Sequence, residues 1–247
     1  MPAPKPRVTP SLPAISLAFL AVYLIWGSTY LAIRWSVETI PPFLMGAVRF
    51  LIAGALLHGW YRARGMAPPT AKQWKAAVIS GGLLLAGGNG AVVVAVQWVP
   101  SGLAALLVGS VPLWIVLVDW VAGARVRPSV RSAIGVMVGF AGIALLAGSP
   151  GVGAGGLKEA FGVVLVLGGA LSWAVGSIYS KYAKGLPSPG PLVSMQMLAG
   201  GGIFLFMSLV AGEPFSFDPA AVSAKSALSL LYLITFGAMV AYAAYMW

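Results

Sequence analysis

The sequence predicts an all-α polytopic membrane protein with about eight transmembrane helices, and three observations support this fold class. Hydrophobic residues make up 60% of the 247 positions and charged residues only 8%, which is outside the usual balance of soluble proteins. Apolar runs near 20 residues long recur along the chain, and each can cross about 30 Å of hydrocarbon as a helix. The lysines and arginines lie almost entirely between these runs.

The predicted crossings follow one another with short polar connections. They span residues 14–33, 43–61, 76–98, 102–121, 133–147, 161–179, 192–211 and 227–247. The first run follows Lys5 and Arg7 but continues into "GSTYLAIRW" without a small-x-small cleavage site, so we interpret it as a retained helix rather than a signal peptide. The fifth run is the shortest of the eight.

Basic residues are distributed very unevenly between alternate loops. One side holds eleven: Lys5, Arg7, Arg62, Arg64, Lys72, Lys75, Arg125, Arg127, Arg131, Lys181 and Lys184. The other side holds only Arg34, Lys158 and Lys225. The positive-inside rule therefore predicts a cytoplasmic N-terminus. The net charge of +10 does not indicate a nucleic-acid interface, since that requires a basic cluster on a soluble surface.

An internal repeat emerges when the chain is compared with itself at an offset of 147 residues. The matched positions are Trp26 with Trp173, Pro42 with Pro189 and Gly90 with Gly237. We predict a cytoplasmic N-terminal segment (1–13), a first five-helix copy (14–148) and a second copy (159–247). Five crossings are an odd number, so the second copy enters the membrane from the opposite side, as in the inverted repeats of secondary transporters. Counterparts of residues 101–149 are missing, so we expect the second copy to lack its last two helices, either as a fragment or as a natural short form.

The segment "LIWGSTYLAIRWSVETIPPFLMGAVRFLIAGALL" resembles the opening of EamA-type bacterial inner-membrane exporters of the drug/metabolite transporter superfamily. Further segments, "GGNGAVVVAVQWVPSGLAALLVGSVPLW" and "GGALSWAVGSIYSKYAK", are similar to later helices of that family. The resemblance spans essentially the whole chain. It implies ten helices in two halves, both termini in the cytoplasm, and export of amino acids, metabolites or drugs.

Arg49 stands out because it lies inside the second apolar run. Six residues after Phe43, at 1.5 Å each, place it about 9 Å below the outer boundary of the membrane. An ionisable residue at such a depth is a functional hypothesis by default. Arg49 either faces the bundle interior and attracts an anionic group or Glu38, or it fixes helix packing and reaches toward the interface.

Other side chains within the runs could line a substrate pathway. We predict the pathway residues to be Trp26, Thr29, Tyr30, Arg49, Asn89, Trp173, Ser177 and Tyr242. An amide in hydrocarbon needs a partner, whereas serine and threonine can bond to their own helix backbone. Trp26 and Trp173 occupy matching places in the two copies. The alternative to a pathway role for these two indoles is packing between helices or anchoring in the lipid interface.

The sequence favours a transporter over two other classes. A membrane enzyme would need clustered metal ligands or an activated nucleophile, yet the chain has no cysteine and a single histidine, His58. The third hypothesis for the function is a structural or assembly protein of the membrane. We predict a multi-pass exporter of the bacterial inner membrane, working by alternating access, with a cavity formed by the first, third, fourth, sixth and eighth helices. Its expected partners are a small-molecule substrate and the lipid bilayer, and a homo-oligomer is compatible with the sequence. No cofactor, metal or nucleic acid is expected.

Overall fold

The computed structural model describes residues 12–122, 127–147 and 156–242, and this part of the chain contains helices and no strand. In chain order the helices are α1 (Leu12–Ser36), α2 (Pro42–Ala63), α3 (Ala71–Gly81), η1 (Gly82–Asn89), α4 (Gly90–Ala95), α5 (Ser101–Val108), α6 (Val111–Ala122), α7 (Val130–Ala147), α8 (Gly156–Tyr182), α9 (Pro189–Val210), α10 (Glu213–Ser216), η2 (Pro219–Ala221), α11 (Ala224–Tyr232) and η3 (Leu233–Val240). The prediction of an all-helical chain is confirmed for the described residues.

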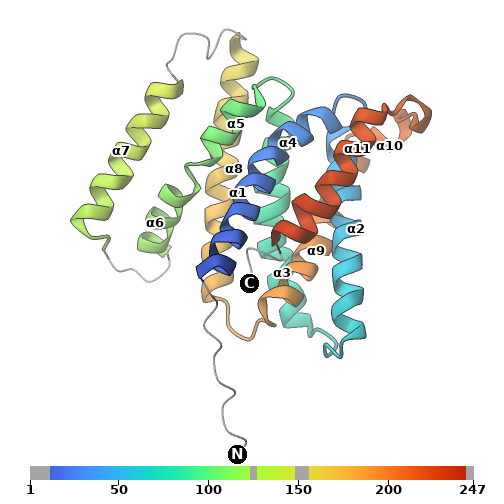
Figure 1. Cartoon of the computed structure of the whole chain (residues 1–247), viewed down its shortest axis with the longest axis horizontal. Coiled ribbons are helices and arrows are strands. Elements are labelled where there is room, and N and C mark those ends of the chain that lie inside the picture. The colour runs from blue at the N-terminus through green and yellow to red at the C-terminus, as the bar shows by residue number, and fades with distance from the viewer. Residues whose placement is uncertain (1–11, 123–126, 148–155, 243–247) are drawn as a thin grey trace, which may run out of the picture.

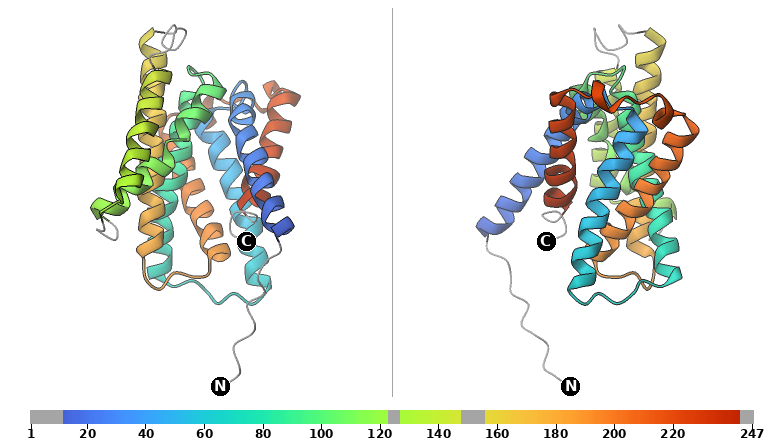
Figure 2. Two further views of the ribbon diagram at one scale, coloured as in Figure 1. Left: turned by 60° about the vertical axis from the view of Figure 1, so that its left-hand side comes forward. Right: turned by 90° about the vertical axis from the view of Figure 1, so that its right-hand side faces the viewer.

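Some consecutive helices follow one another along one axis and together form one rod. Helices α3, η1 and α4 are continuous, and α5 and α6 are joined by a turn at residues 109–110. Five rods are long and apolar enough to span a membrane: Pro42–Ala63, Ala71–Ala95, Ser101–Ala122, Gly156–Tyr182 and Pro189–Val210. Two shorter apolar helices, Val130–Leu145 and Ala224–Val240, correspond to the fifth and eighth predicted crossings. The first predicted crossing forms the 25-residue helix α1. The rods lie roughly side by side, with α7 at one edge (Figures 1 and 2).

The outer surface of the bundle is strongly apolar. Large hydrophobic side chains are exposed on several helices, among them Leu17, Val138, Val164, Phe206 and Leu228. Contiguous apolar surface of this kind is unfavourable in water and normal against lipid tails. The surface therefore agrees with the membrane character that the composition predicts.

Helices α2 and α9 pack closely against each other through glycines. A Cβ on Gly54 would come within 2.9 Å of the backbone nitrogen of Leu198, and one on Gly201 would come equally close to the nitrogen of Leu51. Small residues at such contacts let two helix backbones approach closely, which is how helices associate where lipid removes the hydrophobic driving force. Phe50 and Phe204 stack beside them with ring centroids 5.8 Å apart.

The order of elements in the first part of the chain recurs in the second. Helices α2 and α9 both have 22 residues and both begin with proline, 147 positions apart. An α-helix followed by an eight-residue π-helical segment comes later in each part, as α3 with η1 and as α11 with η3, and in the second part the short helices α10 and η2 precede it. Figure 1 shows that α1 and α8 begin at opposite ends of the bundle, and that α2 and α9 do so as well.

Candidate functional site

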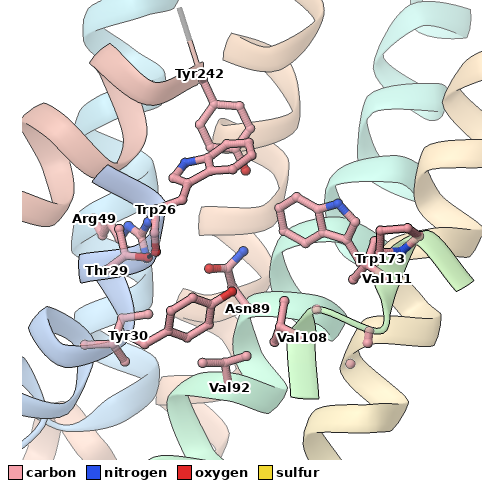
Figure 3. A pocket seen from close by; sticks show the side chains of 15 residues that line it. Trp26, Thr29, Tyr30, Arg49, Asn89, Val92, Val108, Val111, Trp173 and Tyr242 are labelled. Atoms are coloured by element: carbon pink, nitrogen blue, oxygen red, sulfur yellow. Dashed lines mark hydrogen bonds between the residues drawn. The ribbon is translucent and has the colours of Figure 1, made fainter. Parts of the chain in front are cut away.

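A cavity of about 260 Å³ lies where the two hydrophobic cores of the bundle meet. The residues that line it are Trp26, Thr29, Tyr30, Ile33, Arg49, Gly88, Asn89, Val92, Val108, Val111, Pro112, Gly169, Ala170, Trp173 and Tyr242. They come from all five helices that the sequence predicts for the cavity, and α2 adds Arg49. Figure 3 shows these side chains converging from several helices on one space.

Helical spacing explains why certain residues of α1 and of α8 line the cavity together. On α1, Trp26, Tyr30 and Ile33 are separated by four and three residues, so their side chains project from one face. On α8, Gly169 and Trp173 are four residues apart and share a face in the same way. A Cβ on Gly169 would lie 2.6 Å from the Cβ of Ala91, so this glycine lets α8 approach α4 closely beside the cavity.

Interruptions in helix geometry coincide with the cavity. The π-helical segment η1 ends at Asn89, and its last two residues both line the cavity. Between α5 and α6 the helix breaks at residues 109–110, and Pro112 has no N–H to donate to the carbonyl of Val108. Such π-bulges and discontinuous helices are frequent at functional sites of membrane transporters.

The two indoles at matching places of the repeat both belong to this cavity. Nε1 of Trp26 donates to the carbonyl of Gly237 on η3 at 3.3 Å, and its ring meets that of Tyr242 edge to face at 5.3 Å. Trp173 packs against η1, because a Cβ on Gly88 would lie 2.8 Å from the indole. Each indole therefore rests on the π-helical segment of the other half of the chain.

Arg49 is the one charged residue that lines the cavity, and only 3% of its surface is exposed. Its Nε and Nη1 atoms are fully buried and have no hydrogen-bond partner in the described part of the chain. The guanidinium carbon lies 4.7 Å from the centroid of the Phe50 ring, which offers partial cation–π stabilisation. The predicted alternative of a pair with Glu38 is wrong, because that carboxylate forms its salt bridge with Lys225.

Neutral polar groups complete the site. The amide of Asn89 points into the space that the labelled side chains surround in Figure 3, and within the described residues neither this amide nor the hydroxyl of Tyr30 has a hydrogen-bond partner. The hydroxyl of Thr29 instead donates to the carbonyl of Trp26 at 2.6 Å. The unpartnered amide and phenol are available to a molecule in the cavity, while the threonine contributes mainly its methyl face and an oxygen acceptor.

Seven of the eight predicted pathway residues line the cavity and Ser177 does not. The hydroxyl of Ser177 donates to the carbonyl of Trp173 at 2.8 Å, which is the self-satisfied arrangement that serine can adopt inside a helix. The sequence analysis did not single out the small and apolar lining residues, such as Gly169, Ala170 and Val108. The helical spacing of the first two from Trp173 is the signal that could have identified them.

The cavity holds no metal-ligand set. No group of three or more His, Cys, Asp or Glu residues occurs in the described ranges, and the lining residues include none of these types. His58 lies away from the cavity on α2, with Nδ1 3.2 Å from the hydroxyl of Ser194.

Comparison with known proteins gives a consistent picture. The profile of the EamA-like transporter family matches residues 12–148 and again residues 160–247. Uncharacterized inner membrane transporter YedA of Escherichia coli strain K12 is 40% identical over 231 residues, covering 93% of this chain and 72% of the relative. Uncharacterized transporter YvbV of Bacillus subtilis strain 168 is 29% identical over 82% of this chain and 64% of the relative.

More distant similarity extends to a plant and to a solved structure. WAT1-related protein At3g02690, chloroplastic, of Arabidopsis thaliana is 25% identical, covering 92% of this chain and 55% of that protein. A solved crystal structure superposes with a TM-score of 0.65 over 96% of this chain and 79% of its own. Its sequence identity is 23%, so this likeness concerns the fold.

Proposed function

This chain belongs to the EamA-like transporter family, and from that premise we propose that it exports small organic molecules across the bacterial inner membrane by alternating access. Metabolites, amino acids and drugs are the substrate classes that the family resemblance implies. The central cavity is the proposed substrate site, with Trp26, Tyr30, Asn89, Trp173 and Tyr242 in contact with the cargo. The observation that supports this most directly is that matching residues from the two parts of the chain meet there.

The proposed inverted repeat is the feature that supports alternating access. Helices α1 and α8 begin at opposite ends of the bundle, and each carries one of the two cavity indoles (Figure 1). In inverted-repeat transporters the substrate lies near the midplane between the copies, and one copy rocks against the other around it. Because π-helical segments are frequent at functional sites, we propose that η1 and η3 act as the hinge.

The proposed orientation places the N-terminus in the cytoplasm. The end of α2, the start of α3 and the end of α8 lie at the same end of the bundle in Figure 1, and the segments there include Arg62, Arg64, Lys72 and Lys181. The positive-inside rule assigns this basic end to the cytoplasm.

Efflux from cells tests the proposed function. Cells that express the full chain are loaded with a panel of labelled amino acids, organic acids and dyes, and retention is compared with cells that carry the empty vector. We expect faster loss of at least one compound. Asn89→Ala should slow this efflux roughly fivefold to tenfold, the effect of one hydrogen bond of about 1–1.5 kcal/mol.

Gln97→Ala is the matched control for the amide. Gln97 is exposed beyond the end of α4, and its Nε2 donates to the carbonyl of Val94 at 3.2 Å. This variant should keep wild-type efflux. Equal retention with and without the chain across the whole panel would contradict the proposed function, and equal efflux by Asn89→Ala and wild type would remove Asn89 from the site.

A further inference from the structure

The charges around the cavity define the class of its ligand. Resting on the proposed function, we propose that the substrate is an organic monoanion with an apolar body, bound with its anionic group toward Arg49. Among the substrate classes named above, such a site selects organic acids over zwitterionic amino acids and over cations. Three features support this assignment: no acidic residue lines the cavity beside Arg49, the other walls are aromatic or aliphatic, and Asn89 and Tyr30 add neutral polar groups.

Within the described residues, Arg49 has no counter-ion. The whole chain has five acidic residues, and none of them lines the cavity. Two of them form salt bridges, Glu38 with Lys225 and Asp119 with Lys181. Two accept hydrogen bonds from backbone N–H groups, Glu213 from the start of α2 and Asp218 from η2. The fifth, Glu159, lies in the first turn of α8.

A buried charge without a partner is costly, because a low-dielectric interior does not screen or solvate it as water does. A ligand that brings one negative charge into the cavity supplies the missing partner, because Arg49 lines the cavity and its guanidinium group forms no salt bridge with a described carboxylate. One positive side chain matches one negative group. A second charge of either sign on the ligand finds no counterpart among the residues that line the cavity.

The remaining walls suit an apolar or aromatic body. Trp26, Trp173 and Tyr242 offer ring faces, while Ile33 and Val92 offer aliphatic surface. Aromatic and aliphatic walls with a few placed polar groups are the usual composition of a small-molecule site. The cavity volume of about 260 Å³ limits the ligand to a small molecule of this kind.

Asn89 and Tyr30 can orient a carboxylate but cannot neutralise an ammonium group. Both present neutral groups that lack a protein partner. The amide N–H and the phenol O–H can donate to the anion beside Arg49. An ammonium group in the same space would lose its hydration and would gain only neutral acceptors and ring faces, which leaves much of the desolvation cost uncompensated.

Four probes of one shape test the proposal by isothermal titration calorimetry on the purified full chain in detergent near pH 7.5. They are 3-phenylpropanoate, the neutral 3-phenylpropanamide, the cationic 3-phenylpropylamine and zwitterionic phenylalanine. We expect the carboxylate to bind roughly tenfold to hundredfold more tightly than the amide, as expected for a hydrogen-bonded charged group. The amine and the zwitterion should bind more weakly than the carboxylate.

Variants separate charge from packing. Arg49→Gln should bind the carboxylate and the amide with similar affinity, and Arg49→Lys should keep part of the preference for the anion. Arg64→Gln is the matched control, because Arg64 is exposed at the end of α2 and stacks over Trp60. It should retain the full preference. The order of the four probes on the wild-type chain needs no variant, so a poorly folding Arg49 variant does not remove the test.

The outcomes distinguish this inference from the proposed function. Tightest binding of the amide, the amine or phenylalanine, or no binding of any probe, overturns the anion assignment even when the efflux panel shows transport of another compound. Anion selectivity that persists in a folded Arg49→Gln variant overturns it as well. Selective binding of the carboxylate by a chain that exports nothing supports the anion site and refutes transport.

Discussion

Replacing Glu213 with alanine tests how the start of α2 is held in the bundle. Phe43 and Leu44 lie in the first turn of α2, where backbone N–H groups have no acceptor within the helix, and no side chain caps them from position 41. Their N–H groups donate to Oε1 and Oε2 of Glu213 at 3.1 and 2.7 Å. The hydroxyl of Ser208 on α9 donates to Oε2 at 2.8 Å. One carboxylate therefore joins α2 to the end of α9.

The magnitude follows from the interactions that are lost. Removing a side-chain cap costs about 0.5–2 kcal/mol, and removing a negative charge from a helix N-terminus costs about 0.3–1 kcal/mol more. We therefore expect Glu213→Ala to lower the free energy of unfolding by about 2 kcal/mol. At 2–4 °C per kcal/mol for a chain of this size, Tm should fall by roughly 4–8 °C.

Thermal unfolding in detergent, followed by tryptophan fluorescence, measures the effect. Glu213→Gln should fall between wild type and Glu213→Ala, since its amide retains one oxygen acceptor and loses the charge. Glu38→Ala is the control, because Glu38 and Lys225 form an exposed pair whose loss costs at most about 1 kcal/mol. If Tm of Glu213→Ala equals that of wild type, or falls no further than that of Glu38→Ala, the capping argument is refuted.

Two further predictions concern packing and topology. Gly81→Ala should lower the free energy of unfolding by about 1–3 kcal/mol, because the new Cβ would lie 2.5 Å from the carbonyl oxygen of Gln196. Gly168→Ala, which meets nothing within 4 Å, should be neutral or stabilising by up to about 1 kcal/mol in the same unfolding assay, and equal losses in both variants would contradict the contact. The chain has no cysteine, so Lys72→Cys and Lys158→Cys each introduce a unique thiol, and an impermeant maleimide should label them from opposite faces of the membrane. Labelling of both from one face would refute the inverted topology.

The sequence by itself determined the class of protein and the approximate limits of its helices. Both depend on local properties, namely the length of apolar runs and the prolines that begin α2 and α9. It also identified seven of the fifteen residues that line the cavity, including its one arginine and its aromatic side chains. Polar and aromatic side chains inside apolar runs are few, and lipid restricts where they can lie.

Only the tertiary structure decided which faces of the helices turn inward and which polar side chains form hydrogen bonds or salt bridges with one another. In a membrane the lipid-facing side of a helix is as apolar as its packed side, so hydropathy does not distinguish them. The sequence grouped Ser177 with Trp173, although the serine bonds to its own helix. It also predicted Glu38 as one possible partner of Arg49, although Glu38 forms its salt bridge with Lys225 and no described carboxylate pairs with the arginine. The pair of Glu38 and Lys225 joins residues far apart in the chain, and only the packed helices bring them within bonding distance.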